Sequence, residues 1–283
     1  MKKIIVTAFL AMSLSTFAQV NVPQASPKVE IEQVVGLTEI ELEYARPGMR
    51  DRVVFGEMVP YGKVWRTGAN ENTTIQFSDD VSINGKPLPK GKYALYTVPN
   101  KDNWDVIFYQ DTENWGVPQN WDDKKVVLKV RADISTVEKP IEYLNITVNP
   151  LNNNRGELVI GWEKTQAIVY FEVPTQKKAL QSIEEGLNAN ATARDYYSAA
   201  QYLYSEGIDV DKALSYMEHS IKMSGGDEEA PFYVLRQKAL IQAAIGDKQG
   251  AIVSAKRSSE SAKKAGNEEY IKMNEKSIEE WSK

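Results

Sequence analysis

The stretch AIVYFEVPTQKKALQSIEEGL, residues 167–187, decides the fold because the hydrophobic period changes inside it. Residues 167–173 alternate like a β-strand, Pro174 stops the strand, and residues 178–187 follow a helical spacing. The sequence therefore predicts an α+β protein with its β and α parts in separate domains. We expect a signal peptide over 1–18, a β-sandwich domain over 19–174 and a helical domain over 175–283.

Upstream of Pro174, apolar residues recur at every second position. Ile40, Leu42 and Tyr44 alternate with glutamates, as in a strand with one buried face. Asn84-Gly85 is a strong hairpin signal because both residue types tolerate positive φ, and Asn149-Pro150 is expected to be a turn. The pattern predicts roughly nine or ten strands in an antiparallel sandwich or jelly roll. Further expected strands are Tyr93–Val98, Trp104–Tyr109, Lys125–Val130, Glu142–Val148, Glu157–Trp162 and Ala167–Val173.

Downstream of Pro174, the spacing predicts helical hairpins. The expected helices are Asp195–Ser205, Asp211–Met223 with Asp209 or Asp211 as its N-cap, Pro231–Ile245, Lys248–Ala265 and Glu268–Trp281. The pairs resemble tetratricopeptide repeats, in which small residues let helices approach closely. The equivalent residues Ala213 and Ala251 are spaced more widely than the usual repeat of about 34 residues. A generic antiparallel helical bundle is therefore the alternative.

The N-terminus has the order of an export signal. Lys2 and Lys3 supply positive charge, Ile4–Leu14 is apolar, and the small residue Ala18 precedes Gln19. The apolar run is shorter than the about 20 residues of a membrane span, and no other segment approaches that length. We expect a soluble mature chain that begins at Gln19 and is exported to the periplasm or the extracellular space.

Composition narrows the chemistry. The formal net charge is −5, and loss of Lys2 and Lys3 with the signal makes it −7, which argues against nucleic acid and anionic lipid as partners. The chain has no cysteine, so it has no disulfide, no thiolate nucleophile and no zinc–thiolate site. Its stability must come from packing.

Catalytic motifs are scarce. His219 is the only histidine and lies in the helical half, and no Gly-x-Ser-x-Gly occurs. The spacing of Gly48, Gly56 and Gly62 fits neither phosphate-binding fingerprint. We expect no catalytic residue, no metal and no cofactor. Carboxylates are numerous, so a glycosidase pair stays open as an alternative.

The loop of residues 111–123 holds Trp115 and Trp121 among asparagine, glutamine and aspartate side chains. Aromatic faces beside such hydrogen-bonding groups suit a sugar or a peptide. The alternative is that the loop folds its own tryptophans onto the sandwich.

Arginines form a second cluster between Arg46 and Arg66, with Arg50 and Arg52 between them. Converging guanidinium groups bind carboxylate or phosphate in a bidentate manner. The alternative is that they pair with nearby acids and satisfy loop carbonyls; the acids in question are Glu43, Asp51, Glu57 and Glu71.

The segment YGKVWRTGANE, residues 61–71, places a Trp-Arg pair between two turn glycines. We expect Trp65 to be largely buried with an acceptor for its indole N–H. We expect Arg66 to make several hydrogen bonds, with Asn70 or Glu71 among its partners. The ligand-binding candidates are Trp65, Arg66, Asn70, Glu71, Arg46, Arg52, Trp115 and Trp121.

Four motifs carry a family resemblance: YARP at 44–47, RVVFG at 52–56, the segment 61–71, and PKGKYALY at 89–96. Over about residues 26–174 the chain resembles the exported bacterial family named domain of unknown function 2911. The resemblance implies an all-β exported domain and no established activity. Some such proteins carry an asparagine-synthetase label, but this chain lacks the cysteine and the nucleotide loop that label requires.

The sequence favours a non-catalytic binding and interaction protein. The β-domain would hold a small polar ligand, a glycan or a peptide near residues 65–71, and the helical domain would contact a protein partner. The first alternative is a metal-independent carbohydrate-active enzyme with an Asp/Glu pair beside Trp115 and Trp121. The second is a purely structural envelope component.

Overall fold

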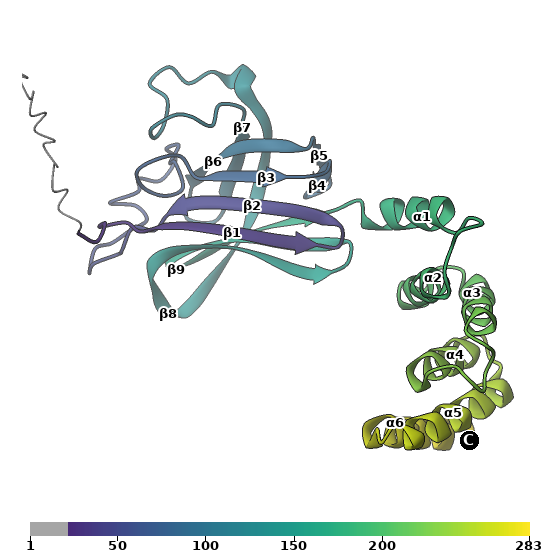
Figure 1. Cartoon of the computed structure of the whole chain (residues 1–283). Helices are drawn as coiled ribbons and strands as arrows, with labels where there is room; N and C mark the ends of the chain where they lie inside the picture. Colours follow the sequence, from purple (N-terminus) through teal and green to yellow (C-terminus); the bar gives the residue numbers. More distant parts are fainter. Residues whose placement is uncertain (1–21) are drawn as a thin grey trace, which may run out of the picture. The chain divides into compact units, whose positions relative to one another are not determined.

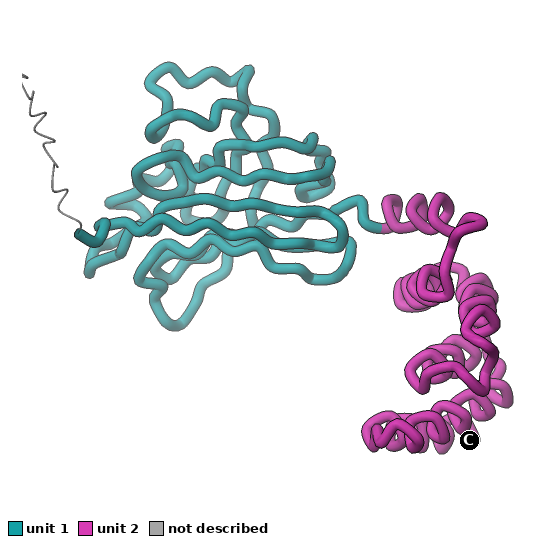
Figure 2. Tube along the Cα trace, viewed as in Figure 1, with its two compact units in different colours: residues 1–175 teal, residues 176–283 magenta. Residues whose placement is uncertain are grey.

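The computed structural model describes residues 22–283, which fall into two compact units divided between Thr175 and Gln176 (Figure 2). The expected signal peptide lies outside the described residues. No helix in the described part of the chain combines the length and the apolar character that crossing a membrane requires.

The first unit is a nine-stranded sheet with the order β1-β2-β3-β6-β7-β8-β9-β4-β5, in which all neighbours are antiparallel (Figure 1). The strands are β1 (Lys28–Val35), β2 (Thr38–Ala45), β3 (Thr74–Phe77), β4 (Val81–Ile83), β5 (Lys86–Leu88), β6 (Gly91–Pro99), β7 (Trp104–Tyr109), β8 (Val126–Asn152) and β9 (Arg155–Glu172). The expected antiparallel β-domain is confirmed.

Strand β8 folds this sheet into two layers. Residues up to Ala132 pair with β7, and residues from Asp133 onward pair with β9. Register shifts after Thr136 and Ile141 interrupt the ladder, and such irregularities bend a strand. The segments expected as separate strands around Lys125–Val130 and Glu142–Val148 are therefore parts of one bent strand.

One expected turn is wrong. Asn149-Pro150 lies inside β8, and the hairpin turn follows at Asn153 and Asn154. Proline is tolerated there because the ladder is irregular between Pro150 and Asn152. The Asn84-Gly85 hairpin between β4 and β5 is confirmed, with φ of 46° and 76°.

Inward-facing residues of both layers share one hydrophobic core. Ile40 and Leu42 of β2 are buried, as their alternation with glutamates predicts. Trp104 of β7 and Trp162 of β9 are each 1% exposed and belong to this core. Phe55 meets Trp104 edge-on at 4.7 Å between ring centroids, so the loop after β2 also contributes to this core.

The second unit is helical. Its helices are α1 (Thr175–Gly186), α2 (Ala193–Ser205), α3 (Val210–Met223), α4 (Phe232–Ala244), α5 (Lys248–Lys264) and α6 (Glu268–Trp281). From α2 onward each helix packs on the next. Asp209 caps α3, as expected, by accepting from the Lys212 N–H. Ala213 and Ala251 are fully buried, so small residues permit close packing of the helices.

Candidate functional site

The loop between β2 and β3 carries most of the predicted site residues, and a buried polar network holds it. Trp65 joins the loop to β6 through main-chain hydrogen bonds of 2.8 and 2.9 Å with Thr97. The Thr67 hydroxyl bonds the Thr97 hydroxyl at 3.1 Å, and the Thr73 hydroxyl donates to the Thr67 carbonyl at 2.8 Å. All three threonines are fully buried, so the backbone beside Arg66 is fixed.

Trp65 packs against the core, as expected, but its indole N–H is not hydrogen-bonded to the described residues. Its ring stacks on Trp162 with centroids 5.8 Å apart and meets Phe55 and Trp104 edge-on. The residue is partly buried, and its indole N–H has no acceptor among residues 22–283. The expectation of a hydrogen-bonded indole is therefore wrong, and the part of Trp65 that does not pack on the core lines a surface cleft.

Arg66 makes fewer hydrogen bonds than expected. Its Nη1 donates to the main-chain carbonyl of Asn70 at 2.8 Å, which confirms Asn70 as a partner, whereas Glu71 is exposed and makes no bond to Arg66. The guanidinium also lies against Gly116, where an added Cβ would be 3.1 Å from Nη1. A guanidinium has five N–H donors, so most of those on Arg66 have no partner in the described residues.

The segment Tyr44–Met49 closes an edge of β8. At Ile146, the main-chain N–H and carbonyl both bond to the Tyr44 hydroxyl. At Leu144, the carbonyl accepts from Arg46 Nε and the N–H donates to the Pro47 carbonyl. At Glu142, the carbonyl accepts from the Met49 N–H. Arg46 Nη2 also donates to the Asn145 side chain at 3.3 Å. We call this segment the Tyr44–Met49 seam, and Arg46 is one of the residues with which it covers the edge of β8.

Carbonyl oxygens, not carboxylates, hold the remaining arginines. Arg52 donates to the carbonyls of Gly48 and Met49, and Arg50 donates to the carbonyl of Ala25. Within the described residues none of the four clustered arginines forms an ion pair. The predicted pairing with nearby acids is therefore wrong. The accompanying prediction, that the arginines satisfy main-chain carbonyls, is confirmed, because the loop directs the guanidinium groups onto backbone oxygens.

A cleft of about 390 Å³ opens beside this loop. Its lining combines three arginines with apolar and small residues: Ala25, Ser26, Pro47, Gly48, Arg50, Arg52, Met58, Val59, Trp65, Arg66, Gly68, Ala69 and Trp162. We call it the arginine cleft. None of the described residues that line the cleft carries a carboxylate, and the carboxylate of nearby Glu142 accepts from the Arg50 main-chain N–H at 2.9 Å. An anionic group entering the cleft would meet positive charge and unused N–H donors.

Backbone strain gathers at the arginine cleft. Arg50, Asp51, Thr67 and Asn70 have positive φ between 50° and 59°, and they are four of the seven non-glycine residues with positive φ in the described chain. Such conformations persist only where the surrounding structure over-determines them, and they cluster at binding sites. Arg50 lines the cleft, and Thr67 and Asn70 flank lining residues Arg66, Gly68 and Ala69.

The loop before β8 separates its two tryptophans. Trp121 packs on Tyr109 and Tyr96, with centroids 4.5 and 5.2 Å away, so the packing alternative is confirmed for Trp121. Trp115 is 70% exposed, so that alternative is wrong for it. The cause lies in Gly116, whose φ is +86° and whose carbonyl accepts from the buried Tyr96 hydroxyl at 3.1 Å. This anchor turns the chain and leaves Trp115 at the surface.

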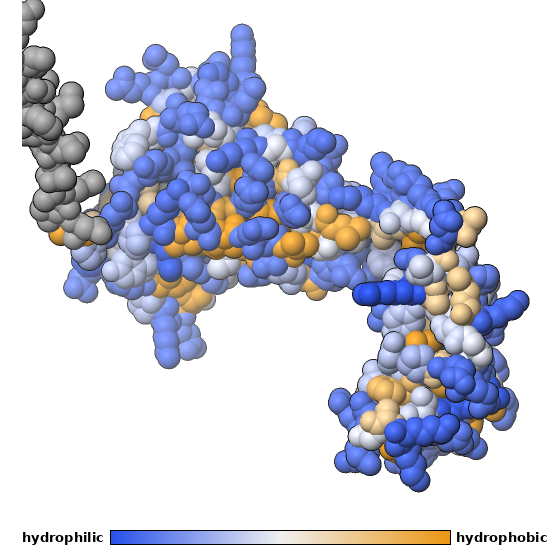
Figure 3. Space-filling model, viewed as in Figure 1, coloured by the Kyte–Doolittle hydropathy of each residue, from blue (hydrophilic) through white to orange (hydrophobic). Residues whose placement is uncertain are grey.

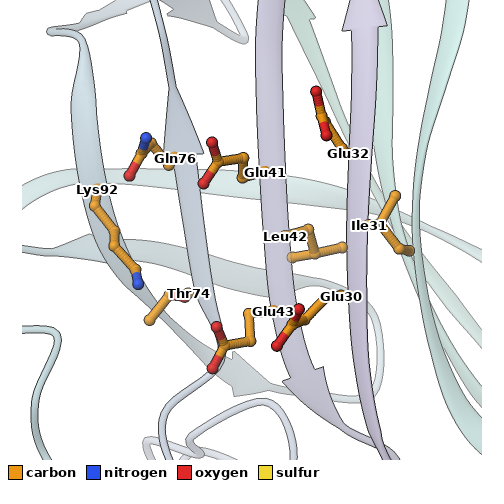
Figure 4. Close-up of a pocket in the computed structure, with 9 residues that line it drawn as sticks. All are labelled: Glu30, Ile31, Glu32, Glu41, Leu42, Glu43, Thr74, Gln76 and Lys92. Carbon is orange, nitrogen blue, oxygen red and sulfur yellow. The ribbon is translucent and has the colours of Figure 1, made fainter.

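A second hollow, about 320 Å³, lies on the outer face of β1, β2, β3 and β6 (Figure 4). Glutamates dominate its lining, and Glu30 and Glu43 approach each other across the strands, with Lys28 bonding both at 2.9 Å. These two carboxylates raise the pKa of Lys28 above its usual range. Figure 3 shows apolar side chains between hydrophilic ones over these strands. This acidic face contains none of the candidate residues from the sequence.

The sequence identified only part of the arginine cleft. It pointed to Trp65, Arg66 and Arg52, which the structure brings together there, but not to Trp162, Met58 or the Ala25-Ser26 wall. These residues converge from distant parts of the chain, and no local pattern signals that contact.

No curated protein and no solved structure matches this chain. A family model described as "Protein of unknown function (DUF2911)" matches residues 26–171. That match covers more than half of the chain and includes the Tyr44–Met49 seam and the whole loop that forms the arginine cleft, so the chain belongs to this family of proteins of unknown function.

Proposed function

We propose that this protein is a non-catalytic binding and interaction protein whose β unit holds a small polar ligand, a glycan or a peptide, in the arginine cleft. The observation that carries the proposal is a cleft lined by Arg50, Arg52 and Arg66, with no carboxylate in its lining among residues 22–283. Trp65, Arg66, Arg52 and the neighbouring Asn70 would contact the ligand or shape its pocket. Arg46 would act through the seam that supports the cleft wall.

Two features favour a binding site over a purely structural knot. Arg66 and Trp65 keep N–H donors without partners in the described residues, although both line the cleft. The positive φ at Arg50 and Thr67 indicates that the surrounding contacts fix the loop in one conformation before any ligand arrives. No Asp or Glu occurs in the part of the lining that the structure describes, which favours binding over a glycosidase mechanism, because that mechanism needs two carboxyl groups beside the substrate.

The proposal extends to the whole chain. A signal over residues 1–18 would direct export to the periplasm or extracellular space, and the helical domain from residue 175 would contact a protein partner. Tyr233, 44% exposed and edge-on to Tyr197 at 5.9 Å, is a suitable contact residue. Cross-linking of the full chain should capture an envelope protein, and the Tyr233→Ser variant should lose this capture. Equal capture by the unmodified chain and by the variant would refute the role of this helical surface.

A melting-temperature screen of the full chain tests the cleft. The ligands are neutral sugars, sugar acids, tripeptides and inorganic phosphate, and a ligand at about 100 times its Kd stabilises by about 2.7 kcal/mol. We expect a shift with ligands that carry an anionic group and loss of that shift in the Arg52→Ala/Arg66→Ala double variant. Arg131→Ala removes an exposed arginine of the same unit away from the cleft lining and is the matched control. Failure of every ligand class, or a shift that survives the double variant, would overturn the proposal.

A further inference from the structure

Arg66 connects the arginine cleft to the exposed tryptophan. It lines the cleft, and its guanidinium lies against the backbone of Gly116, the residue after Trp115. Gly116 is held by the Tyr96 hydroxyl, which is itself buried and also bonds the side chain of Asn72 at 3.2 Å. Arg66 therefore links two features that the sequence suggests separately, the arginine cluster and the loop that carries Trp115.

We propose that the arginine cleft and Trp115 form one site for an acidic oligosaccharide, in which a sugar carboxylate binds Arg66 and a neighbouring sugar ring stacks on Trp115. This inference rests on the proposed function of the cleft and names its ligand class. No covalent step is involved.

The carboxylate half of the site follows from charge and unused donors. Arg50, Arg52 and Arg66 each give some of their donors to main-chain carbonyls, with bonds between 2.7 and 3.0 Å. Those bonds orient the guanidinium groups without neutralising them, because their acceptors are uncharged. A carboxylate then meets preorganised donors, and charge-assisted hydrogen bonds of this kind are the strong ones.

The sugar half follows from Trp115. An indole ring that is 70% exposed offers a flat apolar face, and the neighbouring side chains Asn114, Gln119 and Asn120 carry hydrogen-bonding groups. Alternating apolar and hydroxyl-bearing surface is characteristic of a sugar ring. An isolated phosphate would use the arginines but would gain nothing from Trp115.

A peptide fits this place less well. A peptide that adds a strand to a free sheet edge gains its affinity from main-chain hydrogen bonds along that edge. The β8 edge that ends beside the cleft is already closed at Glu142, Leu144 and Ile146 by the Tyr44–Met49 seam. A peptide there would lack main-chain partners, whereas a sugar needs only side-chain donors and an aromatic face.

Calorimetric titration of the full chain with trigalacturonate tests the inference. The comparison ligands are its methyl ester, which keeps the rings and removes the charge, trialanine with a free C-terminal carboxylate, and inorganic phosphate. We expect binding of trigalacturonate and at least about tenfold weaker binding of the ester. Arg66→Ala should weaken trigalacturonate binding by about tenfold or more, and Trp115→Ala by about three- to tenfold.

Two variants control for unspecific effects: Arg131→Ala removes an exposed arginine, and Met223→Ala removes an exposed apolar side chain from the helical unit. Both should bind trigalacturonate like the unmodified protein. If trialanine or phosphate binds through Arg66 and trigalacturonate does not, the sugar inference is wrong while the proposed anion-binding cleft stands. If Arg66→Ala and Trp115→Ala both bind trigalacturonate as tightly as the unmodified protein does, the site assignment itself is wrong.

Discussion

The hydroxyl of Tyr44 bonds both main-chain groups of Ile146, donating to its carbonyl at 3.1 Å and accepting from its N–H at 3.0 Å. Tyr44 lies on β2 and Ile146 in the second half of β8, so one side chain joins the two layers of the sandwich. Tyr44 is 2% exposed, and no water reaches the groups it satisfies. Tyr44, the first residue of the family motif at 44–47, therefore satisfies the main-chain groups at the edge of β8 that a neighbouring strand would otherwise pair.

Tyr44→Phe should lower the free energy of unfolding by about 1–3 kcal/mol, because it leaves a buried N–H and a buried carbonyl unpaired while keeping the ring. Urea unfolding of the two proteins measures the difference. The matched control is Tyr143→Phe, since Tyr143 is 43% exposed and should change stability by less than about 0.5 kcal/mol. Equal stability of Tyr44→Phe and the unmodified protein would show that the bond is dispensable.

Stability should also fall at alkaline pH. Burial raises the pKa of Tyr44 and the pKa of Tyr96 above their ordinary value of 10.0. The folded state thus holds these protons more tightly than the unfolded state, so the contribution is complete below pH 10.0 and is lost as pH rises through the raised folded values. Urea unfolding at pH 8 and above pH 10 should show this loss, and the Tyr44→Phe/Tyr96→Phe variant should show a smaller one. An equal loss in both proteins would assign the effect to other groups.

The spacing of apolar residues along the sequence predicted much of the fold. Alternation identified β2, β6 and β7, and helical spacing identified α2 to α6 with bounds that differ by no more than two residues from those observed. The bent β8 was not predictable, because a strand that passes from one layer to the other reads as two short strands with a gap. The edge strand β1 was not singled out, although Val29 and Ile31 alternate with Glu30 and Glu32; both apolar residues are partly buried.

The sequence predicted some of the residues of the candidate site, but not how they are arranged or what they contact. Residue type and turn glycines pointed to Trp65 and Arg66, but nothing local distinguishes an arginine bound to carbonyls from one paired with acids. The partial burial of Trp65 depends on Trp162, almost a hundred positions away along the chain, and on the approach of Ala25-Ser26 to the loop. Those contacts arise from the topology of the sheet.

Gly156→Ala should destabilise the β unit strongly. A Cβ at residue 156 would lie 2.3 Å from the ring of Phe171, which is 2% exposed and packed in the core. Such overpacking costs about 1–3 kcal/mol or more, because a core ring has no free space to enter. Gly186→Ala is the control: nothing lies within 4 Å of its Cβ position at the end of α1, so it should be neutral or slightly stabilising. Thermal unfolding compares the two, and similar melting temperatures would contradict the close contact.

Asn274 organises the interior of the helical unit. It is fully buried on α6, donates to the Ser258 hydroxyl at 2.8 Å and accepts from Arg236 Nη1 at 2.9 Å. Desolvation lowers the pKa of Arg236, which makes this charge sensitive to loss of its acceptor. Asn274→Ala should therefore cost about 1.5–3 kcal/mol in urea unfolding. The exposed neighbour substitution Glu275→Ala should have little effect. A cost no larger than that of Glu275→Ala would show that water replaces the asparagine.

Arg66→Ala separates stability from binding. Arg66 is only half-buried, and its one hydrogen bond to a described residue is with the carbonyl of Asn70, which water can reach once the side chain is gone. The buried threonine network that includes Thr67 holds the loop without it. We therefore expect Arg66→Ala to lower the unfolding free energy by less than about 1 kcal/mol. Thr67→Val, which removes a buried hydroxyl from that network, should cost more. If Arg66→Ala proves the more costly of the two in urea unfolding, Arg66 is a structural residue first and the cleft loses its main ligand-binding group.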